Sequence, residues 1–175
     1  PSRLLVVVFF GAAAGCSGPQ EPVLPVAQTT SPPEFVGSAA CDDCHAAQYT
    51  DWQGSHHQLA MQVANEQTVL GDFDSASVDY FGVTNRMYRD GDRFIMQTGN
   101  ASGDLEEFEI SFTFGVEPLQ QYLTDFADGR KQVLPFAWDT RPSDAGGQRW
   151  YHLYPDEEIR HDDVLHWTGR YANWN

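Results

Sequence analysis

Residues 107–114 read Glu-Phe-Glu-Ile-Ser-Phe-Thr-Phe, a strict alternation of polar and apolar side chains. Because successive side chains of a β-strand point to opposite faces, this period of two predicts a strand with one apolar face. Two further strands are predicted at 83–88 and 93–98, joined across Arg89-Asp90-Gly91-Asp92, whose glycine favours a hairpin turn. The middle of the chain is therefore expected to form an antiparallel meander.

The C-terminal side of this meander is expected to add one helix and one strand. Residues 118–126 predict a short helix, and residues 131–138 predict another strand. Asp139 and Arg141 are expected to form a structural ion pair or a turn contact, and the acidic residues 156–158 a solvated face. No catalytic constellation is visible in this half of the chain.

The strongest chemical signal lies near the N-terminus. The chain has three cysteines, and two of them form Cys41-Asp42-Asp43-Cys44, followed at once by His45. This Cys-x-x-Cys-His pattern is the attachment signature of haem c. The two thiols form thioethers with the vinyl groups on one porphyrin edge, and the adjacent imidazole becomes the proximal iron ligand.

Three other uses of the cysteine pair explain the sequence less well. A redox pair is expected at a helix start after a strand, whereas an extended proline-rich segment precedes Cys41 here. A structural zinc ion needs four ligands, and the chain has no second cysteine pair. A disulfide is compatible with an oxidising compartment but leaves His45 unexplained. We therefore expect at least one covalently bound haem c.

The residues after the cysteine pair predict two short helices. Residues 42–53 place His45, Tyr49 and Trp52 on one helical face, where the two aromatic rings would pack against the porphyrin. A second helix is expected to start at Ser55 with a capping box.

The sixth iron ligand is left open by the sequence. The nearby candidates are His57, His56 and Met61. A methionine would set a higher reduction potential than a histidine. A distal ligand could also come from far along the chain, from His152, His161 or His166.

The first 33 residues predict export. Arg3 precedes a short apolar run and small residues that end at Cys16, which is the pattern of a secretory signal. Small residues before a cysteine are similar to the bacterial lipobox, so Cys16 is the candidate lipidation site; an ordinary signal with a chance cysteine is the alternative. Residues 17–33 are rich in proline and form an extended tether.

The expected domain organisation follows from these segments. It comprises a lipoprotein-type signal peptide (1–16), a tether (17–33), a haem-binding segment (34–68) and a β-rich remainder (69–175). The fold class is expected to be α+β, with short haem-binding helices at the N-terminus packed against the antiparallel meander. The protein should lie in the periplasm or cell envelope, anchored to a membrane by N-terminal lipid.

The charge of the chain limits its partners. The 175 residues carry 25 acidic and 10 basic side chains, giving a formal net charge of −15. Nucleic acid is excluded as a partner because its binding depends on neutralising phosphates with lysine and arginine. A redox partner protein with a basic docking surface fits better, although acidity can also serve solubility alone.

Residues 35–45 together with 52–61 resemble the multihaem Cys-x-x-Cys-His cytochromes. The resemblance is closest to bacterial members in which such motifs precede tetratricopeptide repeats, and the chain is also similar to the tetrahaem cytochromes of nitrifying bacteria. The family pattern Trp-x-x-Ser-x-His falls on Trp52, Ser55 and His57, so the resemblance implies His57 as a haem ligand. Further family-like stretches are 113–123, 137–142, 146–157 and 165–175.

The resemblance also implies a longer parent protein. In the family another Cys-x-x-Cys-His follows soon after the last of these stretches, so we expect an N-terminal fragment truncated at its C-terminus. More haems are then expected in the full-length parent, and His166 or His152 could serve haems bound elsewhere in it.

Three functions remain open from the sequence. An exported c-type cytochrome that carries electrons is favoured, and it needs no substrate. The second is a multihaem oxidoreductase acting on a small inorganic nitrogen or sulfur compound, which requires an open iron position. The third is a lipid-anchored module in which haem is structural and the meander docks a partner.

Overall fold

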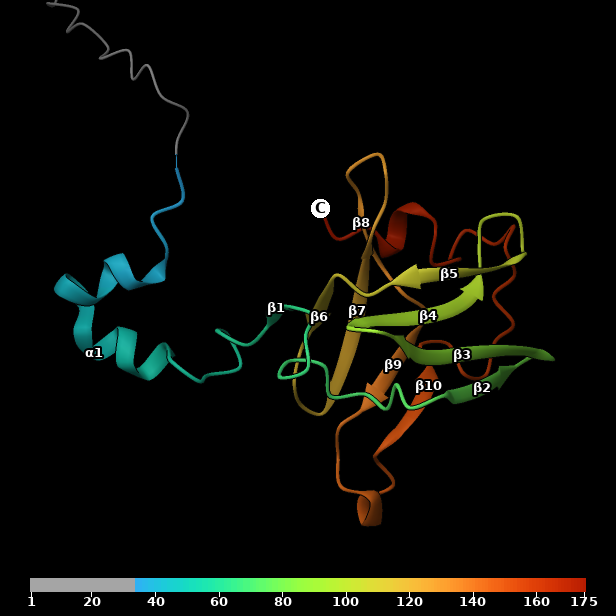
Figure 1. The fold of residues 1–175 in the computed structure, drawn as a ribbon, viewed down its shortest axis with the longest axis horizontal. Coiled ribbons are helices and arrows are strands. Elements are labelled where there is room, and N and C mark those ends of the chain that lie inside the picture. Colours follow the sequence, from blue (N-terminus) through green and yellow to red (C-terminus); the bar gives the residue numbers. More distant parts are fainter. Residues whose placement is uncertain (1–33) are drawn as a thin grey trace, which may run out of the picture. The chain divides into compact units, whose positions relative to one another are not determined.

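The computed structural model describes residues 34–175, and this part of the chain contains one α-helix, three short 3-10 helices and ten strands in two antiparallel sheets. The α+β class is therefore confirmed. Figure 1 shows the order of the elements along the chain. Residues 1–33, which include the predicted signal peptide, the tether and Cys16, lie outside the described residues.

The helical part begins with η1 (Ser38–Cys41), which continues directly into α1 (Asp42–Trp52). The predicted helix over residues 42–53 is confirmed. Asp42 and Asp43 lie in its first turn, where negative charge favours the positive end of the helix dipole. No residue of α1 is buried, and none of the helices among residues 34–175 is long and apolar enough to cross a bilayer.

The second predicted helix, starting at Ser55, is wrong. The capping-type turn does form, because Ser55 Oγ accepts a hydrogen bond from the Gln58 amide at 3.3 Å and Gln58 Oε1 accepts one from the Gly54 amide. The chain then enters β1 (Met61–Val63), which pairs antiparallel with β6 (Phe112–Phe114). Pairing with a distant strand thus replaces the helix that the local pattern favours.

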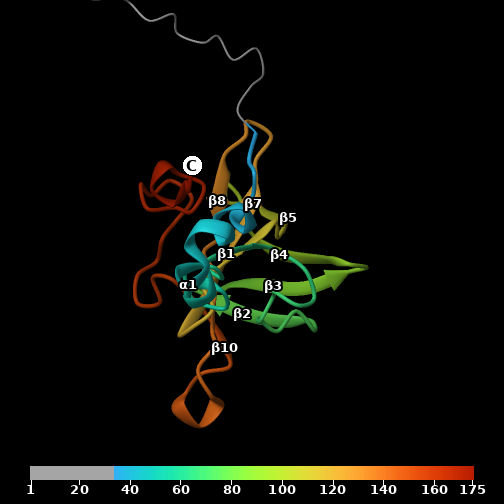
Figure 2. The same cartoon turned by 90° about the vertical axis from the view of Figure 1, so that its left-hand side faces the viewer.

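The first sheet is the expected meander. It contains β2 (Ala76–Tyr80), β3 (Val83–Asp90), β4 (Arg93–Gly99) and β5 (Leu105–Glu109), each paired with the next in sequence. The predicted hairpin is confirmed, and its closing pair is Asp90 and Arg93. Strands β2, β3 and β4 lie side by side in both views (Figure 1 and Figure 2).

The alternating stretch 107–114 forms two strands instead of one. Its first part ends β5, and its last part is β6 of the other sheet. The amide of Ile110 still donates to Phe94 of the first sheet at 2.9 Å, whereas the amide of Ser111 donates to Leu123 of the second at 2.8 Å. The chain therefore passes from one sheet to the other between these two residues.

The second sheet has the order β1-β6-β7-β9-β10, with β8 also paired to β7. The remaining strands are β7 (Leu119–Asp125), β8 (Lys131–Val133), β9 (Phe136–Asp139) and β10 (Arg149–His152). Two short 3-10 helices, η2 (Ser143–Ala145) and η3 (Arg170–Ala172), lie in its connections.

The predicted helix at 118–126 is wrong, because β7 occupies this stretch as a strand with partners on both sides. The predicted strand at 131–138 is divided into β8 and β9. Pro135 lies in the break, and a proline has no amide hydrogen to donate to a ladder.

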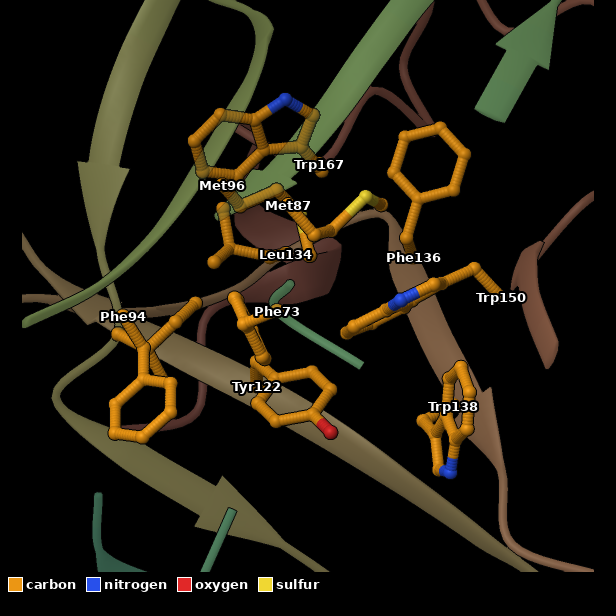
Figure 3. Close-up of a cluster of buried hydrophobic side chains, with 11 residues drawn as sticks. Phe73, Met87, Phe94, Met96, Tyr122, Leu134, Phe136, Trp138, Trp150 and Trp167 are labelled. Carbon is orange, nitrogen blue, oxygen red and sulfur yellow. The ribbon is translucent and has the colours of Figure 1, made fainter. Parts of the chain in front are cut away.

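The core is drawn from both sheets. It joins Met87 and Met96 of the meander to Tyr122, Phe136 and Trp150 of the second sheet (Figure 3). The buried cluster is completed by Phe73, Phe94, Ile110, Leu134, Trp138 and Trp167. These side chains form the buried apolar core of the two sheets, and their burial stabilises the fold.

Candidate haem-attachment site

Cys41 and Cys44 lie at the junction of η1 and α1. Cys41 is the last residue of η1 and Cys44 is in the first turn of α1. Both are free and exposed. A thioether bond requires a thiol that the porphyrin can reach, and two such thiols with an imidazole next to the second are the donor set of haem c. The residues present therefore fit this cofactor.

His45 interrupts the helix immediately after the second cysteine. Its backbone angles are φ −130° and ψ 40°, which are not helical, so α1 is kinked at this residue. The ideal helical spacing predicted from His45 to Tyr49 therefore does not hold across the kink. Tyr49 and Trp52, beyond it, stack with ring centroids 5.8 Å apart and 30° between the planes.

The three nearby distal candidates occupy different local structures. His56 and His57 are exposed in the turns that follow α1. Met61 is half-buried in β1, where it pairs with Phe114. The roles of His45, His56, His57 and Met61 as iron ligands stay predictions. Among residues 34–175, no group of three or more His, Cys, Asp or Glu side chains is arranged to hold a metal ion directly.

The distant histidines gather around a pocket that the sequence did not reveal. His152 and His166 are each 8% exposed, and both line this pocket together with the exposed His161. Burial lowers the pKa of His152 to about 4, and burial also lowers the pKa of His166. The role of His166 at a haem elsewhere stays a prediction.

The Nδ1 atom of each buried histidine forms a hydrogen bond with the residue two positions later in the sequence. His152 Nδ1 accepts from the Tyr154 amide at 3.0 Å, and His166 Nδ1 lies 2.8 Å from the Thr168 hydroxyl. This repeated arrangement leaves Nε2 of both rings for other partners. Sequence reasoning missed it because the two histidines are brought together only by the fold.

The predicted ion pair of Asp139 and Arg141 is confirmed. The guanidinium donates to both carboxylate oxygens, at 2.9 and 2.6 Å. These bonds hold the pKa of Asp139 down at about 2. The acidic run at 156–158 is exposed, as predicted. Both features are structural, and neither adds a reactive group.

Residues 40–78 match the sequence model of the family described as cytochrome c554 and c-prime. The matched segment contains Cys41, Cys44 and His45 and also the three nearby distal candidates. No curated protein and no solved structure shows significant similarity to the chain. The family match supports a c-type cytochrome, that is, a haem-binding electron-transfer protein.

Proposed function

We propose that the chain is an exported, lipid-anchored electron-transfer cytochrome whose haem c is attached to Cys41 and Cys44 and ligated by His45. The observation that carries the proposal is the pair of free, exposed thiols at the start of α1, with the imidazole at the helix kink beside them. When bound, the haem supplies a reversible one-electron change at its iron.

The residues of the chain have separate roles in this proposal. The two thiols keep the cofactor from dissociating, and the proximal imidazole tunes its potential. The stacked rings of Tyr49 and Trp52 form an apolar surface that can exclude water from the porphyrin. None of these residues needs to bind a substrate, which is why electron transfer is favoured over catalysis.

His57 is the proposed distal ligand. Its side chain is exposed in a turn, so no packing contact holds it in another position. Met61, in contrast, is fixed at its backbone by the ladder between β1 and β6. The position of His57 in the Trp-x-x-Ser-x-His pattern supports the same choice.

A basic redox protein is the proposed partner. The chain has a formal net charge of −15, and the exposed acids include Glu106, Glu107 and Glu109 of β5. Opposite charge steers association at a rate that falls with ionic strength. Electron exchange with such a partner should therefore slow as salt is added.

A larger multihaem parent and a location outside the cytoplasm complete the proposal. The Cys-x-x-Cys-His motif and the family match support the location, because proteins of this family are typically extracytoplasmic. Lipid attachment at Cys16 would place the haem at a membrane surface.

The first experiment counts haems and finds lipid together. The full chain is expressed in a host competent in cytochrome c maturation, and a pyridine haemochrome spectrum is combined with the mass of the mature protein. One haem per chain and a lipidated N-terminus at Cys16 are expected. The double variant Cys41→Ala/Cys44→Ala should be colourless. A colourless wild-type protein with free thiols would refute haem attachment.

A second experiment tests the distal ligand with a matched pair of variants. His57→Ala should convert the haem from low spin to high spin and allow the reduced protein to bind carbon monoxide, whereas His56→Ala should change neither property. Unchanged spectra in both variants would exclude His57. Carbon monoxide binding by the wild-type protein would instead favour the oxidoreductase alternative.

A further inference from the structure

The pocket that contains the histidines has a volume of about 410 Å³. Its lining comes from strands of both sheets, namely β2, β3, β4, β7, β8, β9 and β10, and from the segment 158–172. This volume lies in the range of pockets that hold small organic molecules, roughly 300–1,000 Å³. The pocket is separate in sequence from the haem-attachment motif and has no role in the function proposed above.

The polar side chains of Asn85 and Thr98 line this pocket, although they lie on the buried face of the first sheet. Met87 and Met96 face each other across β3 and β4 and are fully buried. The same register brings Asn85 and Thr98 to the next paired position on that face, since side chains two apart share a face. Both are only 3% exposed.

These two side chains have bonding capacity left for a ligand. The Asn85 amide nitrogen donates to the Val83 carbonyl at 3.0 Å, which leaves its Oδ1 atom as an acceptor. The Thr98 hydroxyl also lines the pocket, and a hydroxyl can both donate and accept a hydrogen bond. A bound molecule that forms hydrogen bonds with both groups would be favoured over one that cannot.

Aromatic rings form another part of the lining. The rings of Tyr80 and His152 stack with centroids 3.6 Å apart and 17° between their planes. Phe136 meets His152 edge to face at 5.1 Å, and all three residues line the pocket together with Trp167. Flat aromatic walls of this kind favour a flat aromatic guest.

The interior of the pocket is uncharged at neutral pH. His152 and His166 are buried, and their lowered pKa values keep the imidazoles neutral. The charged lining residues Glu158 and Arg160 are exposed and lie 3.9 Å apart as an ion pair. A charged guest would lose its hydration here without gaining a counter-charge.

We propose that this pocket binds an uncharged, flat aromatic molecule that carries hydroxyl or carbonyl oxygens. Phenols, naphthols and quinols belong to this class. The aromatic wall would hold the ring, and Asn85 and Thr98 would bind its oxygen atoms.

Calorimetry on the haem-loaded full chain tests the proposal with two probes of the same ring size. Neutral 2-naphthol should bind at one site per chain, whereas negatively charged 2-naphthoate should bind at least about tenfold more weakly. Absence of binding by 2-naphthol up to its solubility limit would overturn the proposal. Equal or tighter binding of 2-naphthoate would overturn the uncharged class.

Matched variants locate the binding. Val83→Trp places a large ring in the pocket and should weaken 2-naphthol binding at least about tenfold, whereas Val63→Trp, on β1 outside the pocket, should not.

Thr98→Val removes the hydroxyl at nearly constant volume and should weaken 2-naphthol binding several-fold, whereas Thr84→Val on the exposed face of β3 should not. Equal effects within both pairs would refute this location, and circular dichroism verifies the fold of each variant.

Discussion

The His152 imidazole should make the protein less stable as the pH falls from about 6.5 to about 4. The ring is 8% exposed and stacks on Tyr80, and its burial lowers its pKa from 6.5 to about 4. In the unfolded chain the same imidazole takes up a proton near pH 6.5. Between these values protons bind the unfolded state preferentially, so acidification favours unfolding.

The size of the effect follows from the two pKa values. Each pH unit between them corresponds to about 1.4 kcal/mol, so the gap from 6.5 to about 4 amounts to about 3 kcal/mol. This stability is fully present above about pH 6.5. It is lost progressively toward about pH 4, below which the native state also becomes protonated.

Urea unfolding of wild type and His152→Phe at about pH 7 and about pH 4.5 measures this contribution. Phenylalanine keeps a ring at this position but cannot titrate, and the difference between the two proteins cancels the carboxylates that titrate in the same range. The free energy of unfolding of the wild type should fall by about 2–3 kcal/mol more than that of the variant. The exposed His56→Phe serves as control and should behave as wild type.

Equal losses of the free energy of unfolding in wild type and His152→Phe between the two pH values, within about 0.5 kcal/mol, would contradict this contribution of His152. That result would mean that the native protein protonates this imidazole as readily as the unfolded chain does.

Three further substitutions test contacts that Tyr122 and Asp139 of the second sheet make. Tyr122→Phe removes the hydroxyl that donates to Gln120 Oε1 at 2.9 Å and accepts from the Gly71 amide at 3.0 Å, and it should cost about 1–3 kcal/mol in chemical denaturation. Gly71→Ala would put a methyl group 2.5 Å from the Tyr122 hydroxyl and should cost about 1–3 kcal/mol, so a variant as stable as wild type would contradict the packing. Asp139→Asn removes a carboxylate whose pKa Arg141 holds at about 2, below the usual 3.8. The stability from this carboxylate is present above about pH 4 and lost toward about pH 2, so thermal melts of the variant should show less acid sensitivity over that interval.

The meander could be predicted because its information is local. The Gly91 turn joins two runs of strand-forming residues, and the structure has the hairpin at that place. The passage between sheets after Ile110 could not be predicted, because the alternation of side chains continues unbroken through it. Residues 118–126 contain leucine and glutamine, which favour helices, but strands on both sides of β7 override that preference.

The two candidate sites differ in how far apart their residues lie in the sequence. The haem motif occupies five consecutive residues, Cys41 to His45, so it can be read directly from the sequence. The aromatic pocket needs Asn85, His152 and His166 to meet from distant parts of the chain. Only the strand register shows that Asn85 faces inward, so the pocket required the structure.

The separation of the haem motif from the buried core has a consequence for biogenesis. The residues of the core cluster all lie between Phe73 and Trp167, and neither η1 nor α1, which carry the two cysteines, contributes any of them. The sheets can therefore acquire their native packing before any cofactor arrives. The attachment machinery would then act on an accessible peptide beside an already folded protein, and maturation need not compete with folding.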